Sequence, residues 1–211
     1  AASFVRNAGT INKIRKLAEE YGSRIKIIAK IESGEGIDNL DEIIDAADGV
    51  MVARGDLGVE VEARMIPQLE REMIAKCNEK GKIVITATQM LDSMTHNPRP
   101  TRAEISDVAN AVYDGTSAVM LSGETAAGKY PAETIRAMAK ICEQTEQSID
   151  YAARFRSSDF KIKNTVDAIS HATCGMAIDI GAQAIVACSL SGGTARFLTH
   201  VLHAGAQVVQ P

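Results

Sequence analysis

The feature that most constrains this chain is an alternation of short apolar runs with longer stretches of helical periodicity. The apolar runs occupy residues 25–32, 50–53, 83–87 and 118–121, and apolar residues recur every three or four positions in the segments between them. Near-continuous apolar runs are typical of strands buried on both faces, and helices usually connect such strands when they are parallel. The pattern therefore predicts an α/β fold built from repeated strand–helix units.

Polar residues lie at or just after the end of each predicted strand. They are Lys30 and Glu32, Arg54 and Asp56, Thr88, and Ser122 and Glu124. Because a parallel sheet places all its carboxyl ends on one side, we expect these residues to gather there. A (β/α)₈ barrel and a doubly wound open sheet both have this property. No G-x-G-x-x-G sequence follows any of the strands, which weakens the dinucleotide-binding version of the open sheet.

Lys30 and Glu32 are two residues apart, so on a strand they share one face. With Asp56 they supply two carboxylates and an ammonium group at neighbouring strand ends. Mg²⁺ is commonly held by one or two carboxylates together with substrate oxygens. The spacing suggests a small hard cation beside an anionic substrate, with solvated strand-end charges as the alternative.

Composition excludes several classes of protein. The chain has 211 residues, of which 45% are hydrophobic and 24% charged, and a formal net charge of −4. This is an ordinary globular composition without a basic stripe for nucleic acid, and no apolar run approaches the roughly 20 residues of a membrane span. No signal-peptide pattern opens the chain. The cysteines lack C-x-x-C spacing, which predicts reduced core thiols in a cytosolic protein: Cys77, Cys142, Cys174 and Cys188.

The ends of the chain suggest a larger context. The first residue is not methionine, and residues 1–6 read as a strand entered without a lead-in, so we expect a piece of a longer protein. A charged, serine-containing segment at residues 155–163 interrupts the strand–helix pattern. We place a domain boundary between residues 153 and 154. Beyond it, a helix, a strand at 184–187 and a short strand at 208–209 predict part of a second α/β domain.

Local signals also place individual helix ends. Thr10 is a candidate N-cap for the first helix, and Gly22 its stop. Thr165 is the candidate N-cap of the helix after the domain boundary. Gly34 and Gly36 predict a turn between the first long strand and the next helix.

Five longer motifs together resemble the pyruvate kinase family. They are KIE at 30–32, ARGDLG at 53–58, TATQML at 86–91, NPRPTRAE at 97–104 and MLSGET at 120–125. They occur in that family's order and spacing over about residues 1–150, and the resemblance continues more loosely beyond. It implies the C-terminal half of a TIM (β/α)₈ barrel, followed by part of an α/β regulatory domain.

The resemblance also implies an activity. The expected reaction is a Mg²⁺-dependent phosphoryl transfer from phosphoenolpyruvate to ADP, which gives pyruvate and ATP in glycolysis. K⁺ is the usual second cofactor, although the family's K⁺ ligands are absent from this chain. The family resemblance further implies a cytoplasmic homo-tetramer.

Site roles follow from the motifs residue by residue. Glu32 and Asp56 match the family's Mg²⁺ ligands, and Lys30 matches its catalytic lysine. Gly55, Asp56 and Thr88 match contacts to the substrate, and Thr88 or Ser122 is expected to position a proton donor for the enolate. Strand-end capping is the alternative role for Thr88 and Ser122.

The tail matches the family less well. Ser189, Ser191 and Thr194 resemble part of the loop that binds a sugar-phosphate effector, and S-G-G-T before a helix is a chemically sensible anion nest. A plain turn followed by an N-cap fits it equally well. The residues at 199–205 depart from the family pattern, which puts effector binding in doubt.

Four further residues are weaker candidates. His200 and His203 are three apart and suggest either a metal pair or a solvated helix face. Arg99 and Arg102 suggest phosphate binding, whereas the resemblance places them near a subunit interface.

Two rival functions stay open for the chain, namely another Mg²⁺-dependent barrel enzyme acting on pyruvate or phosphoenolpyruvate and a non-catalytic structural piece.

Overall fold

The computed structural model describes residues 1–157, 161–188, 194–195, 198 and 207–209. It divides the chain into two compact units, Ala1–Gln147 and Ser148–Pro211. The expected boundary between residues 153 and 154 falls inside helix α9 (Tyr151–Ser157) of the second unit.

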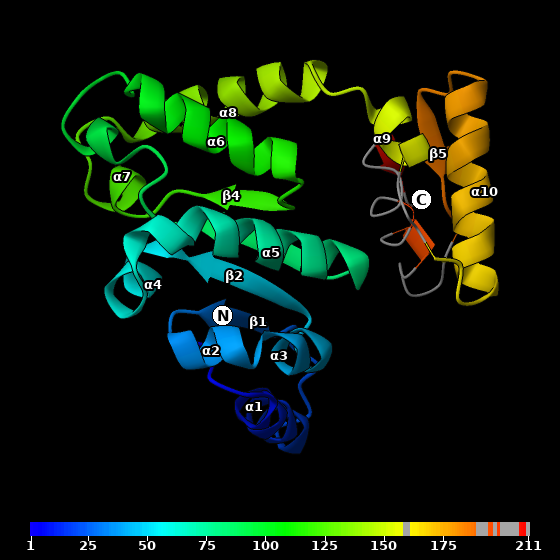
Figure 1. Cartoon of the computed structure of the whole chain (residues 1–211), viewed down its shortest axis with the longest axis horizontal. Helices are drawn as coiled ribbons and strands as arrows, with labels where there is room; N and C mark the ends of the chain where they lie inside the picture. The colour runs from blue at the N-terminus through cyan, green and yellow to red at the C-terminus, as the bar shows by residue number, and fades with distance from the viewer. Residues whose placement is uncertain (158–160, 189–193, 196–197, 199–206, 210–211) are drawn as a thin grey trace. The chain divides into compact units, whose positions relative to one another are not determined.

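The first unit is built on a parallel sheet in the order β1-β2-β3-β4 (Figure 1). Its strands are β1 (Ile28–Ile31), β2 (Gly49–Ala53), β3 (Ile83–Ala87) and β4 (Ala118–Met120). These strands confirm the four predicted apolar runs and the parallel α/β class. The strand expected at residues 1–6 is reduced to an isolated parallel bridge between Ala2 and Ala29.

The register aligns the carboxyl ends of the strands. Ile31 lies beside Val52, and Ala87 lies between Ala53 on one side and Met120 on the other. The residues that follow the four strands therefore emerge at one edge of the sheet, as the sequence predicted.

Helices and short 3₁₀ turns connect the strands of the first unit. They are α1 (Ala8–Glu20), α2 (Gly34–Asp38), α3 (Leu40–Ala46), α4 (Arg54–Glu60), η1 (Ala63–Met65), α5 (Ile66–Glu79), η2 (Asp92–Thr95), α6 (Arg102–Asp114), α7 (Gly123–Ala126) and α8 (Pro131–Gln147). Helix α5 packs against β2 and β3, α1 packs on α3, and α6 packs on α8 (Figure 1).

The face of the sheet under these helices forms the main core. Ala29 and Ile31 of β1 and Val50 and Val52 of β2 are buried there, each with no exposed surface. Burial of one large aliphatic side chain contributes about 1.5–3 kcal/mol. Because side chains alternate along a strand, Lys30 points to the opposite face from Ala29 and Ile31. The helix-covered face thus stabilises the sheet, and Lys30 lies on the other face beside Met51 of β2.

Two helices begin at a different cap from the predicted one. Helix α1 is capped by Asn7, whose side chain accepts a hydrogen bond from the Thr10 amide, so Thr10 lies inside the helix. Helix α10 (Thr165–Asp179) is capped by Asn164 rather than Thr165. At each place an asparagine precedes the threonine, and either residue type can cap. The predicted stop at Gly22 is confirmed by its φ of 69°, which suits glycine.

The turn predicted at Gly34 and Gly36 is wrong, because these residues form helix α2. The Ser33 hydroxyl caps it by accepting a hydrogen bond from the Gly36 amide at 3.2 Å. A Cβ atom at Gly36 would lie 2.9 Å from the carbonyl oxygen of Val5. The glycine therefore marks a close backbone approach, which the sequence does not distinguish from a turn.

The second unit repeats the helix–strand pattern on a smaller scale. Helix α10 follows α9, and strand β5 (Ala184–Val186) pairs in parallel with β6 (Gln207–Val209). Cys174, Ala177 and Ile185 are buried together, with Phe155 packed against them. The predicted helix and strands of this segment are confirmed within its described residues.

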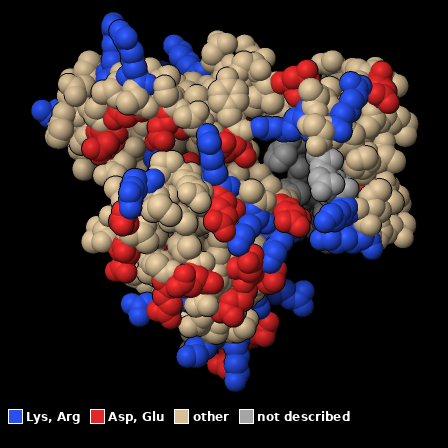
Figure 2. All heavy atoms as spheres, in the orientation of Figure 1, with Lys and Arg blue, Asp and Glu red and all other residues tan. Residues whose placement is uncertain are grey.

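The surface and the thiols are ordinary. On the face of the first unit drawn in Figure 2, acidic and basic side chains are interspersed. Cys77 and Cys174 are buried, and burial raises the pKa of Cys77 to about 12. Cys188 is exposed, so the expectation of four core thiols is wrong there.

Across the described ranges, no helix combines the length and hydrophobicity needed to cross a membrane.

Candidate active site

Lys30 and Glu32 form an ion pair at the carboxyl end of β1. The Lys30 Nζ atom lies 2.6 Å from Glu32 Oε1 and donates a second hydrogen bond to the Ser3 hydroxyl at 3.3 Å. The other carboxylate oxygen of Glu32 accepts a hydrogen bond from the Phe4 amide. The Glu32 side chain is 1% exposed, whereas that of Lys30 is 24% exposed. The pair is therefore anchored at Glu32 and open to solvent at Lys30.

The surroundings of Glu32 favour its ionised form. Burial raises the pKa of the carboxyl, but hydrogen bonds from Lys30 and the Phe4 amide, the charge of Lys30, and the nearby Asp56 side chain together lower it below the usual value. The contact with Asp56 brings the two expected metal ligands together. Two neighbouring carboxylates repel each other unless a cation or a proton lies between them.

Asp56 reaches this place through a strand-to-helix junction rather than a simple strand end. Strand β2 finishes at Ala53, and α4 starts at the next residue, so Asp56 stands in the first turn of that helix. Leu57 is fully buried and fixes the helix to the core. The junction holds Asp56 on short, well-packed backbone, which suits a residue whose position matters.

Thr88 follows β3 in an unusual backbone conformation. Its φ is 70°, and that of Gln89 is 54°, although neither residue is glycine. Left-handed backbone costs about 1–3 kcal/mol at a non-glycine residue and persists only where the surroundings impose it. The Thr88 hydroxyl accepts a hydrogen bond from the Gly55 amide at 2.8 Å and donates one to the Ala87 carbonyl at 2.6 Å. The turn thus aims the hydroxyl at the junction that carries Asp56.

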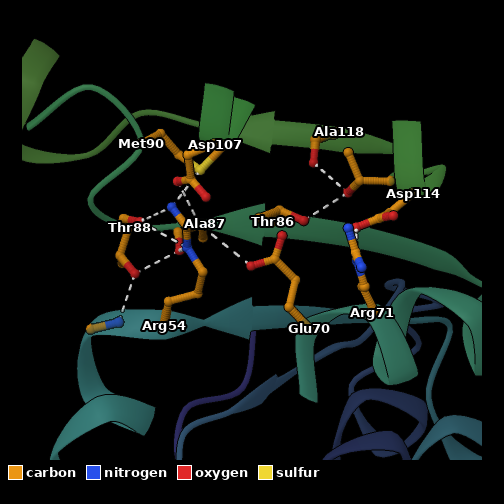
Figure 3. A network of polar contacts seen from close by, with 12 residues as sticks. Arg54, Glu70, Arg71, Thr86, Ala87, Thr88, Met90, Asp107, Asp114 and Ala118 are labelled. Atoms are coloured by element: carbon orange, nitrogen blue, oxygen red, sulfur yellow. Dashed lines mark hydrogen bonds and ion pairs between the residues drawn. The ribbon is translucent and has the colours of Figure 1, made fainter. Parts of the chain in front are cut away.

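Arg54 was noted in the sequence only as a strand-end charge, yet it is the most connected side chain here. Its guanidinium contacts the loop after β3 as well as Glu70 of α5 and Asp107 of α6 (Figure 3). These partners lie 16 to 53 residues away in sequence. No local sequence signal marks them, so sequence reasoning missed this network. A cleft of about 700 Å³ opens beside it, lined in part by Gly55 and Gln89.

Ser122 lies two residues beyond β4, in a segment organised by Glu124. The Glu124 carboxylate is 2% exposed and accepts hydrogen bonds from the amides of Ser122 at 2.7 Å and Leu91 at 3.2 Å. It therefore ties the end of β4 to the loop after β3. The Ser122 side chain makes no capping hydrogen bond to α7. Thr88, by contrast, accepts a hydrogen bond from a backbone amide of α4.

The carboxylates present suit a hard divalent cation that is completed by its substrate. Within the described part of the chain, no three histidine, cysteine or acidic side chains gather at one point. Glu32 and Asp56 are two, and Mg²⁺ keeps several positions for water and phosphate oxygens when one or two carboxylates bind it. The lowered pKa of Glu32 and its contact with Asp56 fit such an ion.

The remaining candidates are less well placed. Thr194 is half-buried at a helical position, while Ser189, Ser191, His200 and His203 lie outside the described residues. Arg99 is exposed in the loop before α6, and Arg102 is the exposed first residue of that helix.

Comparison with known proteins places the chain in a family. Residues 1–135 match the family described as "Pyruvate kinase, barrel domain". The chain is 52% identical to a pyruvate kinase of Clostridium acetobutylicum over 199 residues, which cover 93% of this chain and 42% of that protein. It is 53% identical to one of Geobacillus stearothermophilus over 196 residues, covering 92% and 33%.

A solved structure agrees. The pyruvate kinase from Cryptosporidium parvum superposes with a TM-score of 0.95 at 42% identity, covering all of this chain and 44% of that one. The chain spans less than half the length of these relatives. The family match covers more than half of the chain. This chain belongs to the pyruvate kinase family.

Proposed function

We propose that the protein containing this chain transfers the phosphoryl group of phosphoenolpyruvate to ADP, giving pyruvate and ATP, as a Mg²⁺-dependent enzyme of glycolysis. The observation that carries the proposal is the assembly of Lys30, Glu32 and Asp56 at one edge of the parallel sheet. Phosphoryl transfer depends mainly on positioning and on charge neutralisation, and this assembly offers both.

Each residue of the site has a role in the proposed phosphoryl transfer. Glu32 and Asp56 hold Mg²⁺, and when bound the ion supplies Lewis-acid stabilisation of the phosphoryl and enolate oxygens. Lys30, half anchored by Glu32 and open to solvent, neutralises the charge of the phosphoryl group in transit. The carboxylate end of the substrate contacts Asp56, Gly55 and Thr88. A hydrogen bond between Gly55 and Thr88 holds these two residues side by side.

The enolate released by transfer must then gain a proton. Thr88 and Ser122 follow neighbouring strands, since Ala87 pairs with Met120. In the proposal, one of these two hydroxyls positions the water or relay that delivers the proton.

The fold supports the same proposal at domain level. We assign the first unit to the C-terminal half of a (β/α)₈ barrel and the second to the beginning of an α/β regulatory domain. The match to a barrel-domain family over residues 1–135 supports the first assignment. K⁺ as a second cofactor, a sugar-phosphate effector at Ser189, Ser191 and Thr194, homo-tetramer assembly and a cytoplasmic location complete the proposal by family analogy.

The test is pyruvate formation by the complete gene product that contains this chain. With phosphoenolpyruvate and Mg²⁺, we expect pyruvate only when ADP is added, and one ATP for each pyruvate. Pyruvate formed equally without ADP would overturn the proposal in favour of another pyruvate or phosphoenolpyruvate enzyme. No pyruvate under either condition would favour a non-catalytic protein.

A further inference from the structure

Arg54 begins helix α4, yet its side chain leaves that helix and reaches the loop after β3. Its Nη2 atom donates to the Thr88 carbonyl at 2.7 Å, and its Nε atom donates to the carbonyls of Thr88 at 3.2 Å and Ala87 at 3.3 Å (Figure 3). A further N–H contacts the sulfur of Met90. One guanidinium therefore contacts Ala87, Thr88 and Met90 together.

The loop held in this way is the strained one. Thr88 and Gln89 both have positive φ values, and a β-branched residue such as Thr88 is an outlier in that region. Without an external constraint, a threonine would relax to negative φ. The carbonyls of Ala87 and Thr88 are the backbone groups that flank this strain, and both accept from Arg54. The guanidinium is thus placed to maintain the conformation.

Two acidic side chains hold the guanidinium in turn. Asp107 Oδ2 lies 2.7 Å and Glu70 Oε2 lies 3.4 Å from Nη1 of Arg54. Only 9% of the side-chain surface of Arg54, and of Glu70, is exposed. Burial raises the pKa of Glu70, and the charge of Arg54 opposes that rise. Helices α5 and α6, which supply these carboxylates, therefore fix the arginine against the loop.

This chain of contacts ends at the Thr88 hydroxyl. It meets the Gly55 amide at 2.8 Å, one residue before Asp56. The Arg54 guanidinium donates directly to the Thr88 carbonyl at 2.7 Å, so it is placed to act through Thr88. A planar fork with several donors satisfies two carbonyls and two carboxylates at once, whereas a lysine ammonium is a single point charge.

We propose that Arg54, clamped by Glu70 and Asp107, is a positioning residue of the phosphoryl-transfer site that holds the strained Thr88–Gln89 turn and so fixes the Thr88 hydroxyl. The proposal rests on the function proposed above. Misplacing a catalytic group by about 1 Å can lower a rate by about 100-fold, so the turn is worth holding.

The test is a double-mutant cycle in the complete gene product, with kcat and KM for phosphoenolpyruvate measured for Arg54→Ala, Thr88→Val and the double variant. We expect each single variant to lower kcat by about 100-fold. The kcat of the double variant should lie within about threefold of the kcat of the less active single variant. Effects that multiply to about 10⁴-fold would show that Arg54 does not act through Thr88, and would overturn the proposal.

Chemical rescue separates positioning from a general packing role. Millimolar guanidinium should restore part of the kcat of Arg54→Ala, because the free ion can occupy the place between the carbonyls and the two carboxylates. It should not restore Thr88→Val. Arg71→Ala is the matched control, since Arg71 lines the same cleft but pairs with Asp114 at an exposed position. Absence of rescue in Arg54→Ala, or equal stimulation of all variants, would contradict the proposal.

A second measurement does not depend on activity. In hydrogen exchange, peptides covering residues 86–91 should exchange faster in Arg54→Ala than in wild type, while peptides from β1 and β2 stay protected. Arg54→Lys keeps the positive charge between Glu70 and Asp107 and serves if the alanine variant fails to fold. Unchanged exchange at residues 86–91 would overturn the proposal, whereas inactive wild-type protein with the expected exchange would contradict only the proposed function.

Discussion

The backbone amide of Gly55 donates a 2.8 Å hydrogen bond to the hydroxyl of Thr88, and this bond joins the junction after β2 to the turn after β3. It connects two elements 33 residues apart in sequence at the edge where polar residues gather. The candidate site is therefore a set of loops fastened to one another, and its parts are expected to respond together to substitution.

Thr88→Val tests this bond through stability. The substitution keeps the shape of the side chain but leaves the half-buried Gly55 amide without its acceptor. We expect the free energy of unfolding to fall by about 1 kcal/mol in urea titrations, near the lower range for an unsatisfied donor. Thr88→Ser retains the hydroxyl and should lose less. Equal stability of the valine variant and wild type would show that the bond is not formed in solution.

Lys30→Met separates two chemical steps. Because Lys30 is assigned to the phosphoryl charge, its loss should lower phosphoryl transfer by about 100- to 1,000-fold, the usual cost of one oxyanion donor. Enolate-proton exchange of pyruvate, measured by loss of deuterium from the methyl group, should survive better. Lys30→Arg keeps the positive charge and serves as the control. If exchange and transfer fall by the same factor, Lys30 serves both steps.

Asp48 gives a pH dependence that is independent of the site. Burial raises the pKa of its carboxyl, but the Ile27 amide, Lys26 and Arg15 outweigh burial and lower the pKa to about 2. A carboxyl whose pKa is lower in the folded than in the unfolded protein contributes to stability. This contribution is fully present above the unfolded pKa, near 4, and it is lost as the pH falls towards 2. We expect the stability difference between wild type and Asp48→Asn to be on the order of 1–2 kcal/mol at pH 7, after allowance for solvent screening.

The measurement for Asp48 is the free energy of unfolding of both proteins between pH 7 and pH 2.5. The difference should shrink through this window, because wild type alone loses a charged native contact. A difference that stays constant as the pH falls would mean that the ion pairs with Arg15 and Lys26 contribute nothing measurable in solution.

The sequence predicted those features that depend on local periodicity. The four apolar runs became β1 to β4, and the spacing of two between Lys30 and Glu32 placed them in contact, with 2.6 Å between Nζ and Oε1. Parallel topology then brought Asp56 to Glu32, because both follow neighbouring strands. These inferences use only strand period and the common direction of the strands.

The features that the sequence did not predict depend on contacts between residues far apart in sequence, or on which of two equally suitable capping residues is used. Arg54 meets Asp107 across 53 residues, a pairing that no local pattern encodes. The positive φ of Thr88 is imposed by its surroundings, since threonine has no preference for it. Asn7 and Thr10 are both good caps, so local propensity alone did not decide which one starts α1.

The 211-residue chain by itself should lack phosphoenolpyruvate-to-ADP transfer. Its described β4 pairs only with β3, so a strand edge with unpaired backbone groups remains exposed to other chains. We expect self-association in light scattering and no signal in a coupled pyruvate assay. Activity gained on adding the remaining segment of a full-length relative would agree with this account, whereas a monodisperse monomer with clear activity would contradict it.

Glu32 and Asp56 are proposed to hold the divalent cation jointly. The most direct measurement is a titration of Mn²⁺, as a paramagnetic substitute for Mg²⁺, into the complete gene product with phosphoenolpyruvate present. Glu32→Gln and Asp56→Asn should each weaken binding by at least about tenfold, because losing even an outer-shell partner of a metal ligand costs about that much. Glu62→Gln removes a carboxylate that is 67% exposed and should leave binding unchanged. If both site variants bind Mn²⁺ as tightly as wild type does, the cation is held elsewhere and the account is wrong.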